Sequence, residues 1–244
     1  MKERWIYGFH AVKARLRAAP DSVKEVWLDE TRRDVRAKDL MALAESKGLN
    51  VRQAEASRLD KMVGGARHQG VVAKVETIAQ AQTLDDVLAG IEGSPLIMVL
   101  DGVTDPHNLG AVLRSADAFG AHAVIAPKDK AVGINATVEK VACGAAESVP
   151  YLMVTNLTRS LNELKEHNVW TVATEAGAQR SIAQIDAKVG IAWVLGAEGG
   201  GLRRLTRDTC DEAARIPIGG SMESLNVSVS AAICLYETSR QRTK

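Results

Sequence analysis

Two short apolar runs near the end of the chain are each followed by a loop of small and polar residues. Residues 191–195 precede a glycine-rich loop that holds Glu198, and residues 214–218 precede a Gly-Gly-Ser turn that leads to Ser224 and Asn226. Small residues permit tight turns in which the backbone itself approaches a ligand. The pattern indicates a ligand pocket built largely from backbone groups, and the alternative is two tight turns that join strands to helices.

A third apolar run, residues 96–100, leads through a loop into a predicted helix that Asn108 is expected to cap. Arg114 lies two turns into this helix, among small and apolar residues. A guanidinium at such a position either faces solvent or serves a function. We expect Glu198 to pair with Arg114 or Arg203, or to hold a nucleoside; as a lone glutamate it would be a surface loop residue.

The final loop is expected to end in a helix over residues 226–240, with Ser224 or Asn226 as its cap. Apolar side chains fill most of the first three turns, so this helix must be covered on nearly all sides. One possibility is burial within its own domain, against the helix that begins at Asn108. The other is a second copy of the chain.

Composition limits the class of protein. The 244 residues are 46% hydrophobic, which suits one large domain or two small ones. No apolar run approaches the roughly 20 residues of a membrane span, and the amino terminus carries no apolar signal region. The isolated cysteines predict reduced thiols in a cytoplasmic protein, without metal-ligand spacing: Cys143, Cys210 and Cys234.

The net charge of +1 hides an asymmetry along the chain. Residues 1–75 contain 16 Lys and Arg against 10 Asp and Glu, and the rest of the chain contains 15 against 20. A basic amino-terminal third suggests a polyanionic partner, with an ordinary solvated surface as the alternative.

The order of apolar runs and turn signals predicts two α/β domains. The first covers residues 1–75, with helices at 12–19, 34–47 and 57–62, the last capped by Ser57, and strands at 23–28, 50–54 and 71–75. Residues 76–94 are the predicted linker, small and polar at 79–82, with Thr83 capping a short helix. Residues 95–244 form the second domain, a parallel sheet with strands at 96–100, 122–126, 150–154, 169–173, 191–195 and 214–218.

Three sequence motifs, in this order, resemble those of the SPOUT superfamily of methyltransferases, in its TrmH/SpoU branch. They are NLGAVLRSADAFGA, VLGAEGGGL and IPIGGSMESLNVSVSAA. The likeness extends over the whole chain, including an N-terminal domain that begins IYGFHAV and ends HQGVVAKV. It implies a deep trefoil knot in the last third of the chain, which general folding rules disfavour. It also implies an L30e-like RNA-binding domain over residues 1–75.

The resemblance implies S-adenosylmethionine as cofactor and no metal. The dinucleotide fingerprint G-x-G-x-x-G is absent after the first strand of the second domain. Carried onto this chain, the cofactor-binding residues are Thr174, Gly196, Ala197, Ile216, Ile218, Leu225 and Asn226. The residues implied for catalysis or substrate contact are Asn108, Arg114, Glu198, Ser224 and Asn226.

The family role of Arg114 is activation of a ribose 2′-hydroxyl. A guanidinium stays protonated, so we expect it to clamp the adjacent phosphate and stabilise the alkoxide. The resemblance further implies a cytoplasmic homodimer joined through the catalytic domain, acting on a guanosine of 23S ribosomal RNA. The alternatives are a sister enzyme for another ribosomal or transfer RNA nucleotide, and a non-catalytic RNA-binding protein on the same scaffold.

Overall fold

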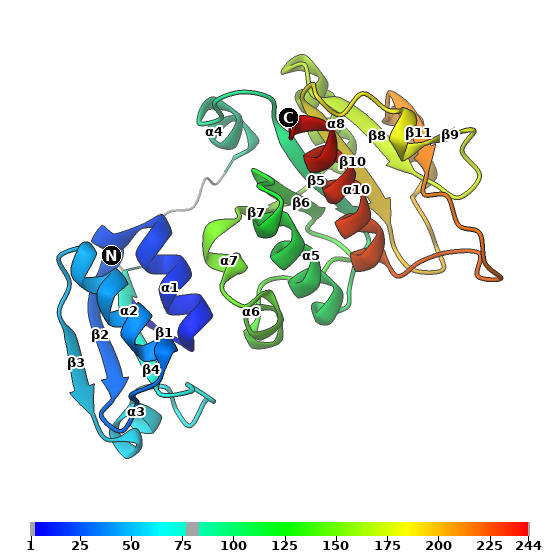
Figure 1. Ribbon diagram of the computed structural model, residues 1–244. Helices are drawn as coiled ribbons and strands as arrows, with labels where there is room; N and C mark the ends of the chain where they lie inside the picture. Colours follow the sequence, from blue (N-terminus) through cyan, green and yellow to red (C-terminus); the bar gives the residue numbers. More distant parts are fainter. Residues whose placement is uncertain (1–2, 77–82, 244) are drawn as a thin grey trace. The chain divides into compact units, whose positions relative to one another are not determined.

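The computed structural model describes residues 3–76 and 83–243. The chain divides into two compact units, residues 1–80 and 81–244 (Figure 1). The small polar stretch predicted within the linker, residues 79–82, lies outside the described residues. Among the helices of the described ranges, none is both long and apolar enough to cross a membrane.

The first unit is a four-stranded mixed sheet with helices packed against it. The strand order is β1-β4-β2-β3; β4 is antiparallel to β1 and β2, and β3 is parallel to β2. Helices α1 and α2 enclose the main core of this unit, while Leu59 of α3 packs with Trp27 in a smaller cluster. In chain order the elements are β1 (Glu3–Tyr7), α1 (Phe9–Ala18), β2 (Val23–Asp29), α2 (Val35–Ser46), β3 (Val51–Ala54), α3 (Ala56–Met62) and β4 (Val71–Glu76).

Two details of this unit differ from the sequence prediction. Strand β1 was not among the predicted strands, and it pairs along its length with β4. The expected cap of α3, Ser57, is wrong: the helix starts one residue before it, and Glu55 occupies the N-cap position. The serine hydroxyl bonds the Glu55 carboxylate instead.

The second unit is built on a seven-stranded sheet, which confirms the predicted parallel arrangement. The strand order is β7-β6-β5-β10-β8-β11-β9, and every neighbouring pair is parallel. The strands are β5 (Leu96–Asp101), β6 (Ala123–Pro127), β7 (Tyr151–Val154), β8 (Trp170–Thr174), β9 (Arg180–Ser181), β10 (Ile191–Gly196) and β11 (Glu212–Arg215).

Helices cover both faces of this sheet, as the continuous apolar strands require. One face packs against α5 (Pro106–Ala118), α6 (Ala136–Ala142), α7 (Ala145–Ser148) and α10 (Val227–Arg242). The other face packs against α4 (Leu84–Ala89) and α8 (Leu157–Glu166), with α9 (Arg204–Thr209) beside α8. Helices α5 and α10 lie side by side (Figure 1).

Three local predictions for this unit meet different outcomes. Asn226 caps α10 as expected: its side-chain oxygen accepts from the Ser228 amide at 2.8 Å. Asn108 does not cap α5; Asp105 does, because the proline that follows it suits the first helical position. The last predicted strand is displaced, since β11 ends at Arg215 and the apolar residues 216–218 lie beyond the sheet.

Candidate active site

A cavity opens at the carboxyl edge of the second sheet, where β8, β10 and β11 end. Its volume is about 640 Å³. This edge is where parallel sheets place ligands, because the loops that leave the strands meet there. Every residue predicted to bind a cofactor lines the cavity: Thr174, Gly196, Ala197, Ile216, Ile218, Leu225 and Asn226.

The glycine-rich loop after β10 folds back on the end of its own strand. A Cβ atom at Gly196 would lie 2.0 Å from the carbonyl carbon of Gly201, so only glycine fits there. The amide of Gly201 donates to the carbonyl of Ala197 at 2.9 Å, which closes the loop. The loop therefore presents backbone groups, rather than side chains, to this wall of the cavity.

Three polar side chains from distant parts of the sequence meet beside the cavity. The Asn108 amide nitrogen donates to Oε1 of Glu198 at 3.2 Å, and the Asn226 amide nitrogen donates to Asn108 Oδ1 at 2.9 Å and also to Glu198 Oε1. The Asn226 oxygen is engaged as the α10 cap, which turns its NH₂ group toward Glu198. The carboxylate is thus held by two amide donors from two different helices.

The charge of the cavity is negative. Glu175 and Glu198 are the charged residues among its described lining residues. Apolar side chains, including Ile216 and Leu225, complete the wall. A lining of backbone, apolar groups and carboxylates suits a ligand with a flat apolar part and a positive charge.

The remaining predicted residues are placed differently. Ser224 lines the cavity, in the exposed loop before α10. Arg114 does not line it: this exposed side chain has Nη1 3.7 Å from the sulfur of Cys143. Within one chain Glu198 binds asparagine amides, and Asp101 binds Arg203, so Glu198 is not seen to pair with Arg114 or Arg203. Its alternative role of holding a nucleoside stays a prediction.

The Asp101–Arg203 pair was not predicted from the sequence. The Asp101 side chain has no exposed surface, and Arg203 is half exposed. The signal available was an aspartate that ends a fully apolar strand, a position where an unpaired charge would be costly.

An apolar groove runs between α5 and α10 on the outer surface of the second unit. Val229 and Tyr236 are 46% and 56% exposed, and the Tyr236 ring meets the Phe119 ring edge-on at 6.1 Å. Helix α10 is therefore covered by its own unit on one side only. The groove-lining residues are Ala111, Ser115, Phe119, Ser228, Val229, Ala232, Ile233 and Tyr236.

Comparisons with known proteins agree with this architecture. Residues 95–236 match the SpoU rRNA Methylase family, and residues 5–81 match the family described as RNA 2′-O ribose methyltransferase substrate binding. A relative from Bordetella pertussis, named 23S rRNA (guanosine-2′-O-)-methyltransferase RlmB, is 59% identical over 96% of both chains.

Two solved structures extend the likeness to three dimensions. A crystal structure of an RNA 2′-O ribose methyltransferase has a TM-score of 0.74 and 28% identity, covering 98% of this chain and 89% of that one. The SpoU methyltransferase AviRb from Streptomyces viridochromogenes, in complex with the cofactor AdoMet, shares the fold with a TM-score of 0.74 at 24% identity, covering 98% and 90%.

The fold and the site together define an α/β protein whose ligand pocket lies at the carboxyl edge of a parallel sheet. The chain belongs to the SpoU rRNA Methylase family. The family predicted from the three sequence motifs is confirmed.

Proposed function

We propose that this protein transfers a methyl group from S-adenosylmethionine to the ribose 2′-hydroxyl of a guanosine in 23S ribosomal RNA, in the cytoplasm. The observation that carries the proposal is the meeting of Asn108, Glu198 and Asn226 at one cavity of the methylase-matched unit. A relative 59% identical over 96% of both chains is named for this reaction.

The cavity fits S-adenosylmethionine. Its volume of about 640 Å³ lies within the usual range for small-molecule pockets. Ile216, Ile218 and Leu225 suit the faces of adenine, and backbone groups can bond its edge. The two lining carboxylates, Glu175 and Glu198, suit a molecule that carries sulfonium and ammonium charges.

Some residues of the site bind the cofactor and the nucleoside, and others take part in the methyl transfer. When bound, S-adenosylmethionine supplies an electrophilic methyl carbon. The loops hold the reacting groups in line, which is the main requirement of such a displacement. Asn108, Glu198, Ser224 and Asn226 orient the nucleoside. Arg114 clamps the neighbouring phosphate and stabilises the oxygen as its proton passes to that phosphate or to water.

The exposed groove between α5 and α10 supports a homodimer through the catalytic domain. A two-fold axis across this groove would cover Val229 and Tyr236, which one chain leaves half exposed. Arg114 projects from α5, beside the groove-lining Ala111 and Ser115, and lies outside the cavity lining of its own chain. In the dimer it serves the cavity of the other subunit.

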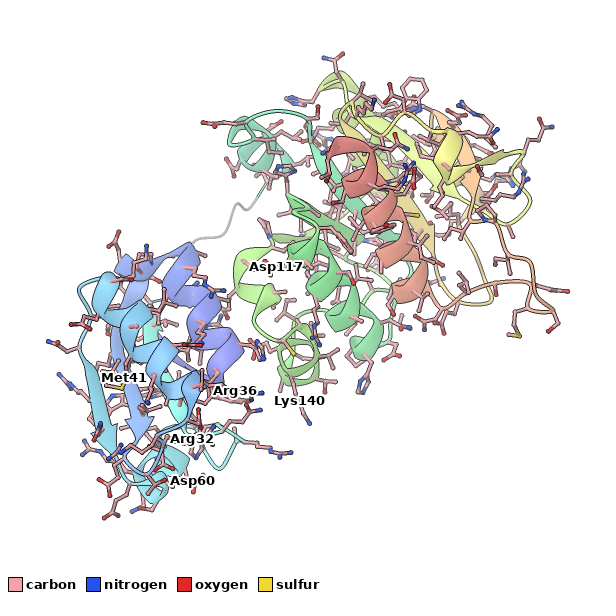
Figure 2. The ribbon with its side chains drawn as sticks, in the orientation of Figure 1. Arg32, Arg36, Met41, Asp60, Asp117 and Lys140 are labelled. Atoms are coloured by element: carbon pink, nitrogen blue, oxygen red, sulfur yellow. The ribbon has the colours of Figure 1, made fainter. Side chains whose placement is uncertain are left out.

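The first unit supplies the RNA contacts in this proposal. Residues 1–75 form an L30e-like substrate-binding domain, 76–94 a linker and 95–244 the catalytic domain, which carries a deep trefoil knot in its last third. The support is the family match over residues 5–81 and the basic charge of the first 75 residues. Arg32 and the exposed Arg36 flank the start of α2 (Figure 2).

The proposal is tested by incubating purified protein with labelled S-adenosylmethionine and either protein-free 23S ribosomal RNA or total transfer RNA. Label in 2′-O-methylguanosine of 23S RNA is the expected result. Label in transfer RNA alone would identify a sister enzyme. Binding of RNA without binding of the cofactor would identify a non-catalytic protein.

A further inference from the structure

We propose that Asp101 and Arg203 form a positioning pair that holds the loop after β10, and with it Glu198, in the arrangement required for methyl transfer. The inference rests on the proposed function for what the loop does. The pair connects the end of β5 to the end of the glycine-rich loop, 102 residues later in the chain.

Both oxygens of the Asp101 carboxylate are committed to Arg203. Oδ1 accepts from Nε of the guanidinium at 2.6 Å and forms an ion pair with Nη2, also at 2.6 Å. Oδ2 accepts from the Arg203 backbone amide at 3.1 Å. A fork of charged donors with an additional main-chain bond fixes the backbone of Arg203 as well as its side chain. Because the carboxylate is fully buried, losing these donors would leave an uncompensated charge.

Besides the Asn108 and Asn226 bonds to Glu198, backbone contacts hold the loop between Gly196 and Arg203 near its ends. On the side where a Cβ atom would lie, Gly200 and Gly201 meet nothing within 4 Å, so no side chain packs there. One end is closed by the hydrogen bond between Gly201 and Ala197. The Asp101–Arg203 pair anchors the other end, and Glu198 lies between the two fixed points.

If the Asp101–Arg203 pair only stabilised the fold, losing any comparable buried carboxylate should have the same effect. Asp211 provides the matched control. The Asp211 carboxylate accepts from the amide and hydroxyl of Thr171 at 2.9 and 2.7 Å and pairs with Lys165 at 3.1 Å. It ties β8 to β11 at their amino ends, the opposite edge of the sheet from the cavity. Its loss removes a comparable set of bonds without touching the loop.

The experiment compares the full-length protein with its D101N, R203K and D211N variants. Hydrogen exchange of residues 197–203 is measured without ligand, followed by calorimetric binding of S-adenosylmethionine and by kcat and KM on a 23S RNA transcript. In D101N we expect faster exchange in this loop and a fall in kcat/KM on the order of 100-fold, the effect of a misplaced reacting geometry. R203K keeps the charge but loses the fork, so it should fall between D101N and wild type. D211N should match wild type in loop exchange and in kcat/KM.

Unchanged loop exchange in R203K and D101N, or equal losses in D211N, would overturn the positioning role. If D101N does not fold, R203K alone tests the positioning role, because its lysine keeps the buried carboxylate paired and should allow the protein to fold. Wild-type protein that fails to methylate the transcript would refute the proposed function instead, and loop exchange would still test the pair.

Discussion

A mixed dimer with a different defect in each subunit tests how the two cavities are completed. One subunit carries Arg114→Ala and the other Glu198→Ala, each with its own affinity tag, so that only heterodimers survive two purifications. If Arg114 serves the partner cavity, one of the two cavities in each heterodimer has both groups intact, and activity should be about half that of wild type. Each mutant homodimer lacks one group at both cavities and should lose roughly 10²–10⁴-fold.

The assay is transfer of labelled methyl groups to 23S RNA, with sedimentation to verify the mass of the dimer. The control heterodimer carries both substitutions in one subunit and none in the other. Under the proposed arrangement neither of its cavities is complete, so it should be as inactive as the mutant homodimers. The opposite pattern, an active control and an inactive mixed dimer, would place Arg114 in its own chain's cavity. A mass near 26.1 kDa with full activity would refute the dimer itself.

Three further variants probe the fold around the site. Asn226→Ala removes the α10 cap and two bonds within the site, so urea unfolding should show a loss of at least about 1 kcal/mol together with lost activity. The Cβ of Gly196→Ala would overlap Gly201, so this variant should show no binding of S-adenosylmethionine by calorimetry, whereas Gly200→Ala should bind it normally. Equal binding by the two variants would contradict the close approach of Gly196 to Gly201. Burial alone would raise the pKa of Asp211, but hydrogen bonds to its carboxylate outweigh burial and lower the pKa. The carboxylate therefore stabilises the fold above about pH 4, and this stabilisation is lost as the pH falls through the lowered pKa. Asp211→Asn should flatten the fall of unfolding free energy below that pH, and an unchanged slope would refute the linkage.

The regular elements were predictable where one signal dominated. Continuous apolar runs between turn residues located the central strands of the second sheet, because a strand buried on both faces has no polar positions. Strand prediction failed where apolar residues line the cavity instead of packing in the sheet. Residues 216–218 resemble the end of a strand but leave the sheet, and Ile216 and Ile218 line the cavity instead.

The candidate site was predictable as a set of residues and not as a set of contacts. The resemblance to the family motifs pointed to Asn108, Glu198 and Asn226. Nothing local in the sequence shows that two amides converge on one carboxylate. The pairing of Asp101 with Arg203 spans 102 residues and depends on the neighbouring positions of β5 and β10 in the sheet. Such contacts depend on the order of the strands in the sheet, which local sequence patterns do not determine.

We infer that this chain methylates one ribose of 23S RNA. The most direct measurement is to treat 23S RNA lacking ribose methylation with the purified protein and S-adenosylmethionine, and to map the product by mass spectrometry of nuclease fragments. We expect a single 2′-O-methylguanosine per RNA molecule, absent when the Glu198→Ala variant is used. A methyl group on a base, on a ribose other than guanosine, or no methyl group at all would contradict it.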